Sequence, residues 1–161
     1  MFDFKAEFYL KIILLLSFIA LISAFFIEHI LGHQPCNLCL IERIPYGLSI
    51  IIITAFFLSK KNQKFLVLLL ILTFIFSFTI SFYHYGIEQG FFQESSVCGV
   101  KNLSESLTKK DLLKQLSEKT ISCSDVTFRI FGLSLTSINI VISLLFIITL
   151  LIIFNKYEKN R

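Results

Sequence analysis

The sequence predicts an all-α integral membrane protein, a bundle of four transmembrane helices with a long outer loop that contains a short amphipathic helix. Of the 161 residues, 55% are hydrophobic, and the mean hydropathy is +0.79, which excludes an ordinary soluble domain. A bilayer core of roughly 30 Å requires about 20 helical residues, and the length of the chain predicts one domain over residues 1–161. Four apolar runs without Asp, Glu, Lys or Arg predict the spans: residues 12–27, 44–59, 65–83 and 130–154.

The first helix is predicted over about residues 9–29, followed by a short outer loop at about 29–40. Gly32 and Pro35 interrupt helical structure in that loop. An apolar N-terminal stretch is also typical of a secretory signal peptide, but no clear small-x-small cleavage site follows this one. We therefore expect an uncleaved first helix.

The second helix is predicted from near Cys39 to Ser59, with Pro45 tolerated in its first turns. A hairpin at residues 60–64 joins it to the third helix, which ends at about Tyr85.

The second outer loop, about residues 84–130, precedes the fourth helix. Within it, Thr108 and Asp111 are placed as an N-cap and an acidic third residue, a pattern typical of a helix start. Leucines follow at positions 112, 113 and 116, so a short amphipathic helix is predicted, resting either in the outer membrane interface or on the bundle.

The basic residues predict the topology, because Lys and Arg are enriched on the cytoplasmic side of membrane proteins. Eight of the fifteen basic residues lie near helix ends that can share one side. They are Lys5, Lys11, Lys60, Lys61, Lys64, Lys156, Lys159 and Arg161. Both termini and the 60–64 hairpin are therefore expected in the cytoplasm, and both outer loops on the opposite side. The net charge of +4 needs no nucleic-acid partner, and none is expected.

All four cysteines, Cys36, Cys39, Cys98 and Cys123, fall in the predicted outer loops, where an oxidising compartment favours disulfide chemistry. A four-cysteine zinc site usually presents two close pairs, whereas 24 residues separate Cys98 from Cys123, so no metal is expected. A bridge between Cys36 and Cys39 would constrain little chain entropy, so this pair is interpreted as redox-active. The pair Cys98 and Cys123 is open to either a structural or a redox role.

A helix that begins near Cys36 would place Cys36, Cys39 and Arg43 on one face, and this column is the candidate active site. Glu42 falls on another face and is interpreted as a structural partner or interface residue. His33 is expected to be solvated.

The segment 36–43, CNLCLIER, together with the four spans, the second cysteine pair and residues 131–133, FGL, resembles the DsbB family of bacterial disulfide-generating membrane proteins. The resemblance implies a four-helix bundle in the bacterial inner membrane, with the cysteines on the periplasmic side. It implies a thiol:quinone oxidoreductase that oxidises a soluble periplasmic DsbA-type thioredoxin-fold protein. The electrons would pass to ubiquinone or menaquinone from the membrane pool.

The same resemblance implies roles for the cysteines. Cys98 would form the mixed disulfide with the partner, and Cys123 would then attack the sulfur of Cys36. Cys39 would be the thiolate that faces the quinone.

Two further residues are implied as quinone ligands. Arg43 would stabilise the thiolate form of Cys39 and hydrogen-bond a quinone oxygen, although an interfacial Arg can also simply anchor a helix. His84, at the outer end of the third helix, would donate to the quinone or its reduced form.

Two alternatives are retained. The first is a non-catalytic four-helix scaffold whose outer loops are stapled by two disulfides. The second is a protein of the vitamin K epoxide reductase type, in which the loop cysteines precede the membrane pair, the reverse of the order found here.

Overall fold

The computed structural model of the chain describes residues 4–59, 62–93, 123, 129–130 and 132–159. Within them it contains four long helices and a short antiparallel hairpin. In chain order the elements are α1 (Phe4–His29), α2 (Asn37–Leu58), α3 (Gln63–Glu88), β1 (Arg129–Ile130), β2 (Leu133–Ser134) and α5 (Leu135–Lys159).

The predicted fold class is confirmed, because all four helices are long and apolar enough to cross a bilayer. The loop after α1 contains Gly32 with a φ of 72°, so the predicted interruption is present. The amphipathic helix expected from Thr108 onward lies outside the described residues.

Three helix starts differ from the predicted ones, and the first is that of α1, which begins at Phe4 rather than at about Tyr9. α2 begins at Asn37 because Cys36 caps it: the Cys36 Sγ accepts a hydrogen bond from the backbone N–H of Cys39 at 3.2 Å. α5 begins at Leu135, although its apolar run starts at Ile130, because the first residues of the run form the hairpin.

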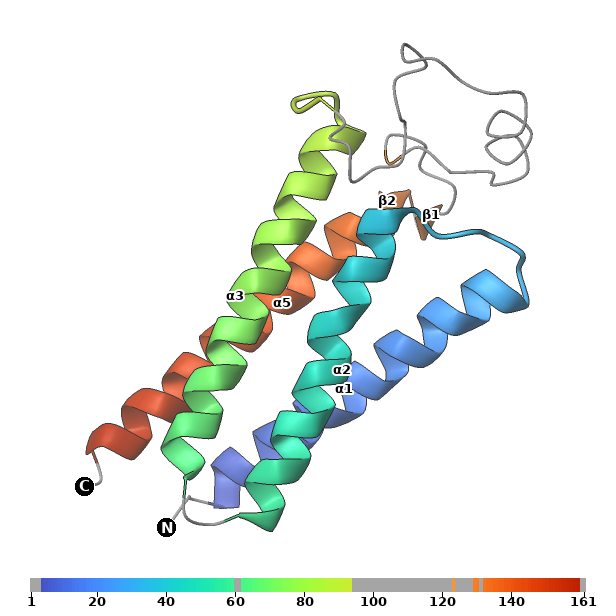
Figure 1. Cartoon of the computed structure of the whole chain (residues 1–161). Coiled ribbons are helices and arrows are strands. Elements are labelled where there is room, and N and C mark those ends of the chain that lie inside the picture. Colours follow the sequence, from blue (N-terminus) through green and yellow to red (C-terminus); the bar gives the residue numbers. More distant parts are fainter. Residues whose placement is uncertain (1–3, 60–61, 94–122, 124–128, 131, 160–161) are drawn as a thin grey trace, which may run out of the picture.

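The helices are arranged so that both chain ends lie together. Figure 1 shows the N- and C-terminal ends and the α2–α3 connection at one end of the bundle, and the α1–α2 loop and the hairpin at the other. α3 packs extensively on α5 and on α2, and α1 packs on α2 but contacts α5 little. This arrangement leaves room between α1 and α5 near the start of α2.

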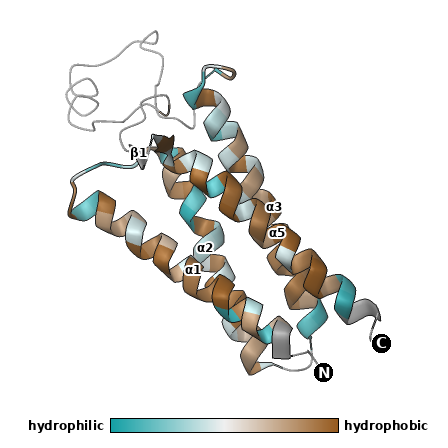
Figure 2. Cartoon of the chain, turned by 180° about the vertical axis from the view of Figure 1, so that it is seen from behind, coloured by the Kyte–Doolittle hydropathy of each residue, from teal (hydrophilic) through white to brown (hydrophobic). Residues whose placement is uncertain are grey.

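Large apolar side chains cover the outside of the bundle, and small polar side chains join helices within it. Figure 2 shows hydrophobic residues along most of the length of each helix. Ser49 of α2 donates to Ser17 of α1 at 3.0 Å, and the hydroxyls of Ser77 on α3 and Ser143 on α5 are 3.1 Å apart. All four are buried. Small residues that hydrogen-bond across helices are typical of membrane bundles, because they permit close approach where lipid gives no hydrophobic driving force.

Candidate active site

The two cysteines of the CNLC segment form a close pair at the N-terminus of α2. The Sγ atoms of Cys36 and Cys39 are 2.7 Å apart, and Cys36 is buried whereas Cys39 is half-buried. Because a cap residue and the third residue of a helix lie over the same turn, the short spacing itself brings the two sulfurs together. The pair is therefore positioned to close a disulfide without movement of the backbone.

The Cys36 sulfur faces α3, where it meets His84. The His84 Nε2 lies 3.6 Å from the Cys36 Sγ, and its Nδ1 lies 2.9 Å from the Glu42 Oε1. The hydrogen bond from the Cys39 thiol lowers the pKa of Cys36 to about 4, with His84 acting in the same direction and burial opposing both. The lowered pKa favours the thiolate of Cys36, which is the nucleophilic form.

This pKa predicts a measurable thiolate. In a Cys98→Ser/Cys123→Ser variant that keeps only the CNLC pair, the ultraviolet absorbance of one thiolate should be present at neutral pH. It should be lost only as the pH falls through about 4. His84→Gln should move the midpoint upward, whereas His29→Gln, at the exposed end of α1, should leave it unchanged. A wild-type midpoint near the usual value for a cysteine would contradict the geometry.

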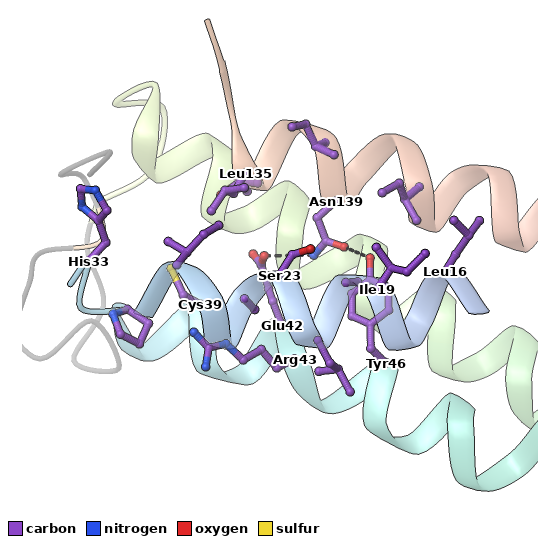
Figure 3. A pocket seen from close by; sticks show the side chains of 18 of the residues that line it. Leu16, Ile19, Ser23, His33, Cys39, Glu42, Arg43, Tyr46, Leu135 and Asn139 are labelled. Atoms are coloured by element: carbon purple, nitrogen blue, oxygen red, sulfur yellow. Dashed lines mark hydrogen bonds between the residues drawn. The ribbon is translucent and has the colours of Figure 1, made fainter. Parts of the chain in front are cut away.

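The Cys39 side of the pair opens to a cavity of about 350 Å³ between α1, α2 and α5. Its walls are mostly aliphatic, with Leu16, Ile19 and Leu135 among the lining residues shown in Figure 3. The volume lies at the lower end of the range typical of small-molecule pockets. Of the residues that the structure describes, those lining the cavity include Cys39 but not Cys36, so the two sulfurs have different surroundings.

Arg43 lines the same cavity one helical turn beyond Cys39. Its guanidinium donates to the Glu28 carboxylate of α1, and its Cζ lies 5.3 Å from the centre of the Phe25 ring. An ion pair and a cation–π contact together fix the side chain at the cavity wall. The predicted column is thus only partly correct: Cys39 and Arg43 share the cavity, but Cys36 turns toward α3.

A buried polar network lies behind the cavity wall, and Glu42, expected on another face as a structural partner or interface residue, belongs both to this network and to the cavity lining. The Glu42 Oε2 accepts a hydrogen bond from the Asn139 Nδ2 of α5 at 3.0 Å, and the Asn139 Oδ1 accepts one from the Tyr46 hydroxyl (Figure 3). Asn139 Nδ2 also donates to the hydroxyl of Ser81 on α3 at 2.7 Å. Glu42, Tyr46 and Asn139 all line the cavity. This network joins α2, α3 and α5 beside the cysteines.

His84 was expected to face a ligand, but its ring is directed elsewhere. Both ring nitrogens are engaged inside the bundle, one by Cys36 and the other by Glu42, and among the described residues His84 is not one that lines the cavity. His33 was expected to be solvated, yet it is half-buried and lines the cavity. His84 is therefore not positioned as a direct ligand for a molecule in this cavity.

The second cysteine pair is described in part. Cys123 is 3% exposed and belongs to the same buried cluster as Cys36, together with Leu38 and Ile87. Cys98 lies outside the described residues. One member of the loop pair is thus packed beside the capping cysteine of α2.

The cysteines and His84 also form a cluster dense enough to be considered as a metal site. Their three possible ligand atoms lie within 4.8 Å of one another. In a tetrahedral zinc site with Zn–S distances of about 2.3 Å, two sulfurs lie roughly 3.8 Å apart. Because the sulfurs here are only 2.7 Å apart, the geometry favours a thiol pair over a shared metal ligand set. The expectation of no metal stays a prediction.

Three polar residues of the site were not singled out from the sequence: Glu28, Tyr46 and Asn139. A polar side chain inside an apolar membrane run is itself a signal of function, and Asn139 is the only Asn in the run 130–154. Glu28 gave no such signal because it directly follows the apolar run of α1, at its outer end.

The bundle and the cysteine pair beside an intramembrane cavity define a multi-pass membrane protein with a thiol site at one end. A family described as "Disulfide bond formation protein DsbB" matches residues 6–153, and the chain belongs to this family. It is also 30% identical over 152 residues to the uncharacterized protein RP370 of Rickettsia prowazekii (strain Madrid E), covering 93% of this chain and 88% of that protein. Membership of this family indicates that the chain is a membrane oxidoreductase that acts in disulfide bond formation.

Proposed function

We propose that this protein generates disulfides by oxidising the dithiol of a soluble periplasmic DsbA-type thioredoxin-fold protein and passing the electrons to a membrane quinone. The observation that carries the proposal is the position of the CNLC pair. Cys39 lines an apolar cavity within the bundle, while Cys36, 2.7 Å away, packs in one cluster with Cys123 of the outer loop. A single pair therefore connects the outer loop with a site that a lipid-soluble molecule can reach.

The cavity fits a quinone head group. Its aliphatic walls suit an apolar ring and tail, and the Arg43 guanidinium provides N–H donors for the ring oxygens. Arg43 would donate to one of these oxygens, and Cys39 would face the ring. A bound quinone supplies a two-electron, two-proton acceptor, so that one dithiol becomes one disulfide as one quinone becomes hydroquinone. Either ubiquinone or menaquinone satisfies this chemistry.

The residues around Cys36 support its role in exchange with the loop. Its thiolate is stabilised by the Cys39 thiol and by His84 in a buried position, and a stabilised thiolate is a good leaving group when Cys98 attacks the Cys123–Cys36 disulfide. In the oxidising direction the partner thiolate attacks Cys98 and releases Cys123, and Cys123 then attacks Cys36 and releases Cys39. Cys98 next displaces Cys36, which restores the loop disulfide, and the Cys36–Cys39 disulfide would reform as the quinone accepts two electrons.

The direct experiment is anaerobic turnover with purified protein in nanodiscs, a reduced DsbA-type protein and a quinone. We expect one partner disulfide to form for each hydroquinone, over many turnovers. The absence of both products, with intact fold and accessible thiols, would instead favour the stapled scaffold. A Cys36→Ser/Cys39→Ser variant serves as the matched control for quinone reduction by the partner alone.

The order of exchange predicts a trapped adduct. When Cys123 is replaced by Ser and a single-thiol partner is supplied as its mixed disulfide with thionitrobenzoate, Cys98 should displace the thionitrobenzoate, and the covalent complex should accumulate because the sulfur that would resolve it is missing. Peptide mapping of the non-reduced complex identifies the site. An adduct on Cys36 or Cys39, with none on Cys98, would contradict this order while leaving the quinone half of the proposal intact.

The topology predicts which side of the membrane each thiol faces. In intact cells, an impermeant maleimide should label reduced Cys98 from the periplasm. The α2–α3 connection lies at the end of the bundle where both chain termini lie. An Asn62→Cys variant, which adds a thiol there, should be labelled at that position only after the inner membrane is opened. The bias of basic residues supports an orientation with both termini in the cytoplasm. Labelling of Cys98 only from the cytoplasm would contradict that orientation.

A further inference from the structure

The two sulfurs of the CNLC pair lie in different surroundings, and so do the two protons that the pair takes up when it is reduced. Closing the Cys36–Cys39 disulfide forms one S–S bond, delivers two electrons to the acceptor and frees these two protons. Cys39 lines the cavity, so its proton lies beside the acceptor. Cys36 does not; the residue is 6% exposed, and its sulfur is directed toward His84 of α3. Because Cys36 is a thiolate in the reduced pair, the second proton is held by the groups beside it and needs a path to the cavity.

His84 and Glu42 connect Cys36 with the cavity by a different route from the sulfurs. The His84 Nε2 is 3.6 Å from the Cys36 Sγ, and its Nδ1 is 2.9 Å from the Glu42 Oε1. An imidazole can accept a proton at one nitrogen and release another from the opposite nitrogen without turning. Glu42 is one of the residues that line the cavity, so its carboxylate meets both the imidazole and the space for the acceptor.

The surroundings hold this pair of groups in place. The Asn139 amide donates to the second Glu42 oxygen, and the Thr136 hydroxyl lies 3.4 Å from the His84 Nδ1. His84 is 3% exposed and Glu42 is 8% exposed, so bulk water does not compete along the path. Low exposure also keeps the transferred proton from being lost to the outside.

Glu88 is the other carboxylate near His84. Its Oε1 is 3.9 Å from the His84 Nε2 and accepts a hydrogen bond from Thr136 at 2.6 Å. Among the described residues Glu88 does not line the cavity, so it stabilises a charged imidazole without offering a route to the acceptor. Besides Cys36 and Cys39 on α2, Glu42 and Glu88 are the titratable groups that the structure places around this ring.

We propose that His84 and Glu42 hold the second proton of the reduced pair beside the Cys36 thiolate and form its path, with Glu42 as the last carrier before the quinone in the cavity. This inference rests on the proposed function. The electrons leave through the Cys39 sulfur, the proton of Cys39 passes directly, and the second proton passes from His84 through Glu42. Two electrons and two protons thus reach the same acceptor by separate routes.

The test compares Glu42→Gln with Glu88→Gln. The second substitution removes the other carboxylate beside the His84 ring but leaves Glu42 and the proposed path in place. In quinone-free Cys98→Ser/Cys123→Ser protein, reduction of the CNLC pair loads the path with a proton. The infrared difference spectrum should contain a D2O-sensitive carboxyl signal that Glu42→Gln loses and Glu88→Gln keeps. A signal that survives in Glu42→Gln would overturn the proposal.

The second readout is the rate at which the reduced pair converts quinone to hydroquinone in one turnover. Glu42→Gln should slow this step by about a hundredfold, the usual scale of a positioned proton carrier, while exchange with the partner is unchanged. Glu42→Asp should recover part of the rate, and Glu88→Gln should change it by less than about threefold. Equal slowing by Glu42→Gln and Glu88→Gln would assign Glu42 to a purely electrostatic role.

The two proposals fail in different ways. If the wild-type pair reduces no quinone, the proposed function fails, whatever the infrared spectrum shows. If quinone is reduced normally and Glu42→Gln has no effect on rate or spectrum, only the proton path fails. Thermal unfolding of each variant in detergent distinguishes these outcomes from loss of the fold.

Discussion

Cys39→Ser should abolish catalytic turnover while leaving a single round of partner oxidation. The cavity-facing sulfur would be missing, so Cys36 would have no second sulfur with which to reform a disulfide. We expect multiple-turnover quinone reduction to fall by at least about a thousandfold, as when a covalent nucleophile is removed. The loop disulfide would still accept electrons once, which gives a burst of one partner disulfide per protein.

The measurement is the amount of oxidised partner against time with excess quinone. Wild-type protein should continue past the first equivalent, and Cys39→Ser should stop there. Ser23→Ala, at another position of the cavity wall, is the matched control for small changes in the lining. Continued turnover by Cys39→Ser would mean that electrons reach the quinone without the CNLC pair.

Arg43→Ala should weaken the apparent affinity for quinone more than any other substitution in the cavity wall. A hydrogen bond from a charged donor is worth about 1.5–3 kcal/mol, which corresponds to roughly ten- to a hundredfold in affinity. Arg43→Lys should recover only part of the affinity, because an ammonium lacks the planar donor fork. The quinone dependence is measured at saturating partner.

Glu28→Gln tests whether quinone affinity depends on where the Arg43 side chain is held, and not only on whether Arg43 is present. The Glu28 carboxylate of α1 holds the guanidinium at the cavity, so its loss should release the side chain and weaken quinone affinity by less than Arg43→Ala does. Exchange between partner and loop should be unchanged in both variants. An unaltered quinone affinity in Arg43→Ala would reduce Arg43 to an interfacial anchor.

The four spans and the cysteine pair at the start of α2 were predictable because their signals are local. Long apolar runs identify membrane helices by length alone. The spacing of Cys36 and Cys39 fixes their proximity once a helix starts between them, and the structure adds only that Cys36 is the cap.

The direction in which each site residue faces was not predictable. Helices that are apolar all round carry no amphipathic stripe, so the sequence does not tell which side meets a neighbouring helix. His84 therefore carried no signal that its ring would meet Cys36 and Glu42 on α2. The same lack of pattern hid the contact of Asn139 on α5 with Glu42, which depends on how three helices pack together.

The central claim is that the CNLC pair itself delivers electrons to a quinone in the membrane. The most direct measurement uses Cys98→Ser/Cys123→Ser protein, with Cys36 and Cys39 fully reduced, mixed anaerobically with one equivalent of quinone and no partner. The proposed function predicts the loss of two thiols and the formation of one hydroquinone per protein. Two thiols that persist beside unreduced quinone, in protein whose fold is intact, would contradict it.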